Sequence, residues 1–275
     1  MKIGFIGSGK VGVSLARYFK KKEINIIGFY EVDKEKIKKY NNEFEFFIDL
    51  KEFVNKIDII FITVNDDNIK YIKKELENLK IKNKILIHMS GSLSSNEIKI
   101  ENNFAYSIHP MFAFSDDNTK NIEKATFSIE GDAEKLDFLI DFFNNLGNKI
   151  IKIDLNKKDM YHLSNVIVSN LVLSLIDIGI NYLSKCGIEK KEAKKAIFPL
   201  IDNNINNIKT KDIEKAVTGP IERADTVTIK KHLNVIKDID KDLYIRLSEN
   251  LIKLSKLKNT NKDYESLVEI LRSDK

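Results

Sequence analysis

The chain has 275 residues, with 46 basic and 41 acidic side chains, a formal net charge of +5 and a hydrophobic fraction of 43%. This length accommodates two domains of ordinary size, and the composition is typical of a globular protein. The basic residues are spread along the chain, whereas a nucleic-acid-binding surface would gather them on one face or in one tail, so no nucleic-acid partner is expected.

Cysteine usage and hydropathy indicate the compartment. Cys186 is the only cysteine, which excludes an intramolecular disulfide and a four-sulfur metal site within one chain, and we predict no metal site. Residues 1–6 run directly into a glycine-rich turn without the long apolar stretch of a secretion signal. The longest apolar run, residues 166–180, is interrupted by polar side chains, which predicts a buried helix and no membrane span. We therefore expect a cytoplasmic protein with no membrane partner.

Short β-rich runs alternate with amphipathic helical stretches through the first half of the chain. This alternation predicts a Rossmann-type α/β domain over residues 1–154, with a doubly wound parallel sheet, helices on both faces and ligands at the carboxyl ends of the strands. A helix is expected over residues 133–146. The expected strands are residues 3–6, 24–30, a weaker 45–48, 57–64, 85–89, 104–108, 126–130 and 149–153.

The pattern changes after Asp154, because the remaining residues show helical periodicity and no convincing strand. Residues 155–275 are therefore predicted to form an all-helical C-terminal domain for substrate binding and dimerisation. An apolar first helix commonly provides a symmetric interface, so we expect a homodimer. The expected helices are residues 157–186, 189–207, 225–237, 240–256 and 261–272.

A glycine-rich loop follows the first expected strand and opens a helix. The first glycine permits the tight turn, the second lets the backbone approach a pyrophosphate, and the third allows close packing of helix on strand. Free N–H groups at the helix N-terminus then face the phosphates, although a glycine turn without a ligand is the alternative. The predicted cofactor-binding residues of this loop are Gly7, Ser8, Gly9, Lys10, Val11 and Gly12.

Glu31 lies just past the second expected strand, where a carboxylate can accept hydrogen bonds from both ribose hydroxyls of NAD and repel the 2′-phosphate of NADP. Lys34 and Lys36 lie close enough in the chain to neutralise such a phosphate, and Glu31 could instead point into solvent. The cofactor is therefore NAD or NADP, with a weak preference for NAD.

Polar residues follow the next two strands of the predicted crevice. The loop of Ser90, Gly91 and Ser92 follows the fifth strand, and His109 follows the sixth, so both are expected to face the nicotinamide. Hydroxyls and N–H groups of the loop could hold a carboxylate, or they could form a plain polar turn. His88 falls inside the strand and is expected to be a hydrogen-bonded core histidine.

The first helix of the second half carries a polar stripe on an otherwise apolar surface. At about 100° per residue, Asn165 and Ser169 fall near His162, and Asn170 extends the stripe. Histidine needs the least tuning to act as a general acid near neutral pH. The alternative is that this face only forms hydrogen bonds with the neighbouring domain.

Arg223 lies in the segment that joins two expected helices, residues 219–227, among small and polar side chains. Arginine binds carboxylates through a bidentate fork, which makes Arg223 a candidate for the substrate carboxylate. In the alternative, Asp225 and Thr226 cap the next helix and Arg223 pairs with Glu222 or Asp225.

Together these motifs resemble a family of two-domain oxidoreductases with an N-terminal Rossmann-like domain and a C-terminal helical domain long catalogued as of unknown function, within the 6-phosphogluconate-dehydrogenase-like group. We place Val64 and Asn65, with Ser90, among the cofactor-binding residues. The segments that carry the resemblance are residues 7–12, 63–67, 88–95, 109–111, 161–162 and 170, and residues 219–225 with 232–233.

The resemblance implies an activity, because some members of this family are alternative ketopantoate reductases, which reduce 2-dehydropantoate to pantoate for pantothenate biosynthesis. The more familiar ketopantoate reductases have a lysine and two asparagines at four-residue steps on the corresponding helix. Here His162, Val166 and Asn170 stand in those places. Histidine can replace lysine as proton donor, but Val166 cannot form a hydrogen bond, so Asn165 or Ser169 would contact the substrate. Glu31 also departs from the basic or hydroxyl residues of NADP-preferring relatives.

The predicted reaction is transfer of a hydride to the keto carbon of a small 2-oxo acid. His162 is expected to protonate the carbonyl oxygen, Asn165 or Asn170 to orient it, and His109 to line the nicotinamide pocket. Arg223 or the Ser90 loop would hold the carboxylate. Residues 109–111 also resemble a segment of prephenate dehydrogenases, and the glycine loop resembles that of the imine-reducing pyrroline-5-carboxylate reductases. A non-catalytic NAD(P)-binding regulator is the alternative from another class.

Overall fold

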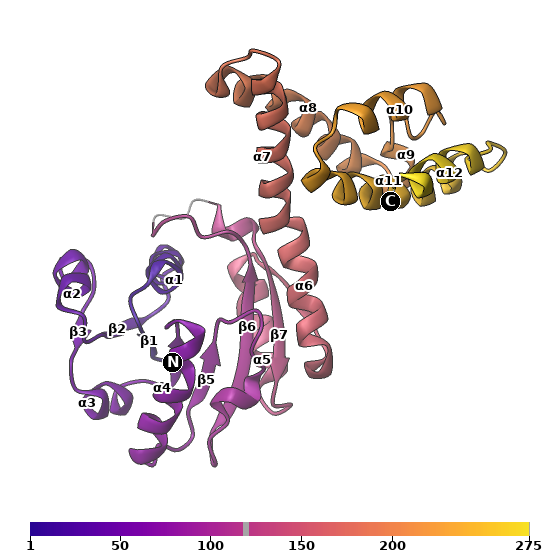
Figure 1. Ribbon diagram of the computed structural model, residues 1–275. Coiled ribbons are helices and arrows are strands. Elements are labelled where there is room, and N and C mark those ends of the chain that lie inside the picture. The colour runs from indigo at the N-terminus through magenta and orange to yellow at the C-terminus, as the bar shows by residue number, and fades with distance from the viewer. Residues whose placement is uncertain (118–120, 275) are drawn as a thin grey trace. The chain divides into compact units, whose positions relative to one another are not determined.

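The protein is described here by a computed structural model that covers residues 1–117 and 121–274 (Figure 1). The chain divides into two compact units, Met1–Ser174 and Leu175–Lys275. The first unit contains the whole sheet, and the described residues of the second form helices joined by loops, without a strand.

The sheet of the first unit has eight strands in the order β3-β2-β1-β4-β5-β6-β7-β8. All neighbouring strands are parallel except β6 and β7, which are antiparallel. The chain order reverses between β1 and β4, which is the switch point where ligands bind in such folds. The strands are β1 (Ile3–Ile6), β2 (Ile26–Tyr30), β3 (Phe46–Phe47), β4 (Ile59–Ile62), β5 (Ile85–His88), β6 (Phe104–Met111), β7 (Thr126–Gly131) and β8 (Lys149–Lys152).

This arrangement confirms the predicted Rossmann-type domain followed by an all-helical region. One expectation about β6 was wrong, because the strand continues to Met111 and His109 therefore lies inside it. The antiparallel pairing with β7 extends the strand, since His109 lies opposite Ser128 and Met111 opposite Thr126.

Helices cover both faces of the sheet because the central strands are buried on both sides. Side chains of α1 and α5 pack in one hydrophobic cluster, and those of α3 and α4 pack in another. The helices of this unit are α1 (Lys10–Lys21), α2 (Lys34–Tyr40), α3 (Leu50–Asn55), α4 (Asp66–Asn78), α5 (Leu136–Leu146) and α6 (Lys158–Val168), with short 3-10 helices η1 (Ser95–Ile98), η2 (Ile122–Lys124) and η3 (Leu155–Lys157).

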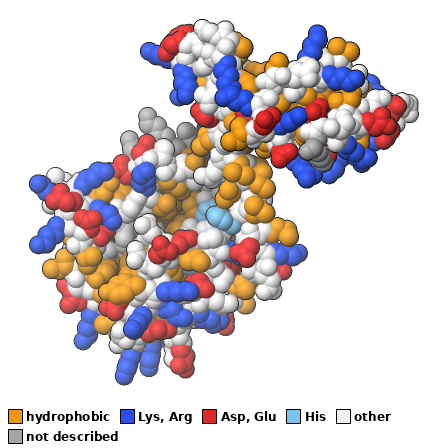
Figure 2. All heavy atoms as spheres, in the orientation of Figure 1, with side chains coloured by type: hydrophobic (Ala, Val, Ile, Leu, Met, Phe, Trp, Pro, Cys, Tyr) orange, Lys and Arg blue, Asp and Glu red, His pale blue; other side chains and the backbone are white. Residues whose placement is uncertain are grey.

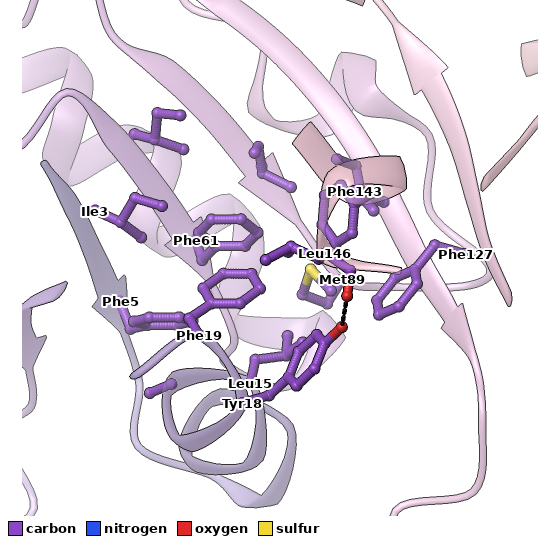
Figure 3. Close-up of a cluster of buried hydrophobic side chains, with 14 of the residues drawn as sticks. Ile3, Phe5, Leu15, Tyr18, Phe19, Phe61, Met89, Phe127, Phe143 and Leu146 are labelled. Atoms are coloured by element: carbon purple, nitrogen blue, oxygen red, sulfur yellow. Dashed lines mark hydrogen bonds between the residues drawn. The ribbon is translucent and has the colours of Figure 1, made fainter. Parts of the chain in front are cut away.

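An aromatic cluster fixes α1 against the sheet (Figure 3). The Phe19 ring of α1 lies 5.4 Å from the ring of Phe61 on β4, and Phe5 on β1 lies 5.3 Å from Phe61. The hydroxyl of Tyr18 donates a hydrogen bond of 2.8 Å to the carbonyl of Leu146, and burial raises the pKa of Tyr18 to about 12. Because α1 follows the glycine loop directly, this packing also holds that loop in place.

The apolar stretch after the sheet differs from the expected single buried helix. It forms two helices, α6 and α7 (Asn170–Lys185), which break at Ser169. Its apolar side chains are exposed in the single chain, with Leu163 at 56% and Leu173 at 66%, and Figure 2 shows hydrophobic side chains gathered along α6. Within the described residues, Leu155–Lys185 is the one stretch whose length and mean hydropathy of 1.8 would suit a membrane span. The expectations of burial and of too much polarity were therefore wrong.

The change from sheet to helices falls where it was expected, because β8 ends at Lys152. The compact units nevertheless divide about twenty residues later, between Ser174 and Leu175. The reason is that α6 packs on the sheet through bonds to β6, from Lys158 to Ser107 and between Tyr161 and His109.

The second unit packs around its own core of buried side chains, including Ile229, Leu233, Ile245 and Leu267. Four of its helices match the expected ones, and the short α9 was not predicted. The helices after α7 are α8 (Lys190–Thr210), α9 (Ile213–Ala216), α10 (Thr226–Val235), α11 (Asp238–Lys258) and α12 (Glu265–Ser273).

Candidate functional site

The three glycines of the loop after β1 differ in what the fold demands of them. Gly7 has a φ of +94°, and a Cβ on Gly12 would lie 2.5 Å from Thr63 Oγ1, so neither position tolerates a side chain. A Cβ on Gly9 would meet only the Thr63 carbonyl oxygen, at 3.7 Å. The fold itself does not need a glycine there. Gly9 is the N-cap residue of α1 and has no side chain that could accept a hydrogen bond from the first turn. The N-terminus of α1 is therefore left open to a ligand.

A cavity of about 280 Å³ opens beside this loop, at the switch point of the sheet. Five predicted cofactor-binding residues line it, whereas Ser8, Lys10, Val11, Gly12 and Ser90 do not. Lys36 and the α4 residues Asn68, Tyr71 and Ile72 line it as well. Sequence reasoning missed the α4 residues, because only the packing of α4 brings them to the loop. The lining consists of Ile6, Gly7, Gly9, Tyr30, Glu31, Val32, Lys36, Thr63, Val64, Asn65, Asn68, Tyr71 and Ile72.

These residues fit a dinucleotide. The space left by the missing side chain of Gly9, next to the N-terminus of α1, suits a pyrophosphate, because N–H groups and the helix dipole favour negative charge. The ring of Tyr71 and the side chain of Ile72 provide apolar wall for a base. Glu31 and Lys36 are the charged groups at the same cavity.

Glu31 braces the glycine loop. Its side chain is only 7% exposed, and one carboxylate oxygen accepts hydrogen bonds from the Ser8 N–H at 2.9 Å and the Ser8 hydroxyl at 2.8 Å. The other oxygen accepts from the N–H groups of Val32 and Asp33 at 3.0 and 3.1 Å. Burial alone would raise the pKa of Glu31, but these bonds and Lys36, at 3.7 Å, hold it below its ordinary value. The expected free acceptor for ribose hydroxyls is thus already engaged, although its charge remains at the cavity.

The loop after β5 already binds a carboxylate of the protein itself. Asp66, at the start of α4, accepts hydrogen bonds from the hydroxyls of Ser90 at 2.7 Å and Ser92 at 2.9 Å. The Ser90 hydroxyl also accepts from the N–H groups of Ser92 and Leu93. These hydroxyls are engaged, and Asp66 would repel a substrate carboxylate, so the loop corresponds to the polar-turn alternative.

His88 is the core histidine that its position in the strand predicted. It is fully buried, its Nε2 donates to the carbonyl of Ser94 at 2.9 Å, and its Nδ1 accepts from the Ser90 N–H. Burial lowers the pKa of His88 to about 4. The neutral imidazole therefore supports the loop after β5.

His109 and Tyr161 form a hydrogen-bonded pair between β6 and α6. The distance from Nδ1 of His109 to the hydroxyl of Tyr161 is 2.8 Å, and the rings meet edge to face at 86°. The ring of His109 also lies against Gly91, where an added Cβ would be 2.9 Å from Nε2. Burial lowers the pKa of His109 to about 4, with a further contribution from the charges of Lys158 and His162.

A buried charged group lies next to this pair and was missed by sequence reasoning. Lys158, only 3% exposed, donates to the hydroxyl of Ser107 and lies 3.7 Å from the carboxylate of Glu130. Ser95 donates its N–H and its hydroxyl to the same carboxylate, at 2.8 and 2.7 Å. Burial lowers the pKa of Lys158, and Glu130 opposes that change. The available signal was Glu130 itself, a charged residue near the end of the buried strand β7.

The predicted polar stripe on α6 bonds mainly to its own helix. Asn165 donates to the carbonyl of Tyr161 at 2.9 Å, and the Ser169 hydroxyl donates to the carbonyl of Asn165. Asn170 begins α7, beyond the break, and accepts from the Ser169 hydroxyl at 2.9 Å. His162 is half-buried on α6 and close enough to His109 to affect its pKa. The structure thus brings His162 near His109 and leaves Asn170 on another helix.

Arg223 lies in the second unit, on an anchored loop. Glu222 accepts a hydrogen bond of 2.8 Å from Asn259 and lies 3.5 Å from Lys258, and Ala224 has a φ of +60°. Asp225 caps α10, as one alternative predicted. Arg223 is exposed, and within the described residues no ion pair joins it to Glu222 or Asp225. The hydrogen bonds from Thr228 and, to a lesser degree, the charge of Arg223 hold the pKa of Asp225 below its ordinary value.

Two family matches cover different parts of this chain. Residues 2–91, which contain the glycine loop and the dinucleotide cavity, match the family described as "NADP oxidoreductase coenzyme F420-dependent". Residues 125–251 match the "Domain of unknown function (DUF2520)". The chain is thus similar to the first family over its N-terminal part and to the second over residues that follow, and each match covers less than half of its length. This pair agrees with the resemblance to two-domain NAD(P)-dependent oxidoreductases.

Several solved structures share the fold over nearly the whole chain. Protein TM1727 from Thermotoga maritima is 22% identical, with a TM-score of 0.75, covering 94% of this chain and 99% of its own. BF3122 from Bacteroides fragilis, provisionally named an NADP oxidoreductase, is 23% identical, with a TM-score of 0.72 and coverage of 92% and 98%. Pyrroline carboxylate reductase from Plasmodium falciparum, with NADP bound, is 17% identical, with a TM-score of 0.64 and coverage of 94% and 96%. None of the curated proteins matches the chain.

Proposed function

We propose that this protein is an NAD(P)H-dependent oxidoreductase that reduces a small 2-oxo acid, with 2-dehydropantoate as the substrate. The observation that carries the proposal is the pairing, within one unit, of a dinucleotide cavity at the switch point with a histidine and tyrosine pair on β6 and α6. In such sheets the ligand lies along the carboxyl ends of the strands, and for this reason we assign both features to one crevice.

When bound, the nicotinamide supplies the hydride, and the protein supplies binding and a proton. The N-terminus of α1 binds the pyrophosphate beside Gly9. Either His109 or His162 gives a proton to the carbonyl oxygen, and Asn165 or Asn170 orients that oxygen. Arg223 binds the carboxylate, because the hydroxyls of the loop after β5 are already engaged by Asp66.

The preferred cofactor in this proposal is NADH. The Glu31 carboxylate stays ionised at the cavity, because its hydrogen bonds lower its pKa below the ordinary value, and a negative charge there opposes a 2′-phosphate. Lys36 is the opposing influence, since its ammonium lines the same cavity.

A substrate screen tests the proposed reaction. Purified protein is assayed with NADH and NADPH against 2-dehydropantoate and pyrroline-5-carboxylate, and with the oxidised cofactors against prephenate. Turnover of 2-dehydropantoate supports the proposal, and exclusive turnover of one of the other two contradicts it. Cofactor binding without turnover of any of them would instead favour a regulator.

We also propose that the protein is a homodimer whose second copy covers the exposed apolar face of α6 and α7. Monomeric soluble proteins rarely expose many neighbouring apolar side chains on one surface. Light scattering at micromolar concentration should give twice the chain mass, and Leu173→Asp should give the monomer mass. Monomeric wild-type protein that sediments with lipid vesicles would contradict this proposal. The face consists of Met160, Leu163, Ile167, Val168, Leu171, Val172 and Leu173.

A further inference from the structure

Two tyrosine and histidine pairs of almost the same geometry occur in this protein. In the first unit, Tyr161 and His109 meet with ring centroids 5.8 Å apart and a hydrogen bond of 2.8 Å to Nδ1. In the second unit, Tyr244 and His232 meet at 5.9 Å with a hydrogen bond of 2.9 Å to Nδ1. Within residues 1–117 and 121–274, only the first pair lies beside a buried ammonium group, that of Lys158. The two pairs therefore differ in surroundings and not in geometry.

The hydrogen bond from Tyr161 determines which nitrogen of His109 carries the proton. A neutral imidazole has one N–H donor and one acceptor nitrogen. A phenol is a stronger acid and a weaker base than an imidazole, so the hydroxyl of Tyr161 donates and Nδ1 of His109 accepts. The proton of His109 is then on Nε2, the nitrogen beside Gly91.

Gly91 has no side chain that would contact Nε2 of His109. Its φ lies outside the left-handed region, so its backbone does not require glycine. A Cβ at this position would lie 2.9 Å from Nε2 and 3.0 Å from the neighbouring ring carbons. Any other residue would therefore displace the ring or cover Nε2. Gly91 follows β5 and His109 lies near the end of β6, and the carboxyl ends of these two parallel strands share the sheet edge where ligands bind in such folds.

Burial keeps the ring of His109 neutral, the charge of Lys158 contributes to this, and Asp66 opposes it. Lys158 and His162 face it from α6, His88 from β5 and Asp66 from α4. The Nζ of Lys158 lies 5.8 Å from the centre of the Tyr161 ring. It also lies 3.7 Å from the carboxylate of Glu130, which balances its charge. A cation at this place disfavours a protonated His109, and it lies over the ring of Tyr161, whose pKa is raised by burial. Lys158 is thus a positioning residue for the pair.

We propose that His109 is the proton donor of the proposed reduction and that Tyr161 replaces its proton. As the hydride from the reduced nicotinamide adds to the carbonyl carbon, the C=O π bond breaks and the oxygen takes the proton from Nε2. Nδ1 then takes the proton of the Tyr161 hydroxyl, the resulting phenolate lies near Lys158, and water returns a proton to it. This assignment rests on the proposed carbonyl reduction, and it selects His109 over His162.

The first test needs no substrate. The ¹⁵N NMR spectrum of histidine side chains distinguishes Nε2–H from Nδ1–H tautomers, and four single His→Gln variants assign the signals. His109 should be neutral with its proton on Nε2 at pH 6, and Tyr161→Phe should change its tautomer ratio while leaving His232 unchanged. Tyr244→Phe is the matched control, which should affect only His232. A proton on Nδ1 of His109 in the wild type would overturn the proposal.

The second test uses whichever acceptor the wild type reduces. Tyr161→Phe and His109→Gln should each lower kcat by about 100-fold or more, the usual contribution of a general acid, with cofactor affinity unchanged. Tyr244→Phe should retain near-normal kcat, and His162→Gln should lower kcat less than His109→Gln does. Loss of turnover in His162→Gln but not in His109→Gln would overturn the proposal. If the wild type reduces none of the acceptors, the proposed function fails, and the NMR result still decides the tautomer.

Discussion

Ser8 donates two hydrogen bonds to one oxygen of the Glu31 carboxylate, from its N–H and from its hydroxyl. The acidic residue at the end of β2 thereby joins the glycine loop to the second strand, 23 positions away in the chain. The same group that stabilises the loop sets the charge at the cofactor cavity. Changes at Glu31 should therefore alter both loop order and cofactor choice.

Glu31→Ser should weaken NADH binding about tenfold, equivalent to ~1.4 kcal/mol, and weaken NADPH binding less. The loss of the loop brace affects both cofactors, but the loss of negative charge beside Lys36 favours the 2′-phosphate. Lys36→Met should act in the opposite direction and weaken NADPH more. Fluorescence titration measures the affinities for NADH and NADPH. The control is Glu35→Ser, which removes an exposed carboxylate on α2, the helix that contains Lys36. Equal effects of Glu31→Ser on both cofactors would contradict the assignment.

Gly9→Ala should separate cofactor binding from folding. A Cβ at this position meets nothing closer than 3.7 Å within the protein, so thermal stability should change little, while dinucleotide affinity falls at least tenfold. Gly12→Ala is the contrasting variant, because its Cβ would overlap Thr63 and the Gly7 carbonyl and should destabilise the fold. Calorimetry gives both stability and affinity. Unchanged cofactor affinity in Gly9→Ala would mean that the pyrophosphate does not lie there.

Arg223→Gln should raise KM for the 2-oxo acid by roughly 10- to 100-fold, because a charged hydrogen bond to a carboxylate contributes about 1.5–3 kcal/mol. Cofactor affinity should be unchanged, since Arg223 lies outside the unit that contains the dinucleotide cavity. Arg246→Gln is the matched control, an exposed arginine whose contact is a 3.5 Å pair with Glu249. Steady-state kinetics measures the effect. Equal KM values for the two variants would exclude Arg223 from carboxylate binding.

Stability should fall as the pH drops from 6.5 towards 4. Burial lowers the pKa of His88 and His109 from 6.5 to about 4, so in this range the unfolded chain binds more protons than the folded protein. Between pH 6.5 and 5 each histidine should reduce the free energy of unfolding by about 2 kcal/mol. Urea unfolding across this range measures the slope, which should be smaller in His109→Gln. A flat profile would show that both rings bind protons in the folded state.

The order of the strands and helices followed from the sequence alone. Runs of Ile and Phe at strand length, alternating with helical periodicity, predict a parallel sheet, and the glycine loop between the first strand and its helix predicts the ligand. These signals are local, because each depends on residues within one element or one turn. The fully buried position of His88 was predicted for the same reason, since its strand neighbours are apolar.

The partners within the site depended on tertiary structure. Tyr161 reaches His109 across 52 positions, and Lys158 reaches Ser107 across 51, because α6 packs on β6. Nothing in the local pattern near Lys158 distinguishes it from the many exposed lysines of this chain. The exposure of α6 and α7 likewise depended on the fold, since an apolar helix is buried only where another surface covers it. The sequence thus determined the elements and the cofactor loop, and tertiary packing determined which distant side chains share protons and charge.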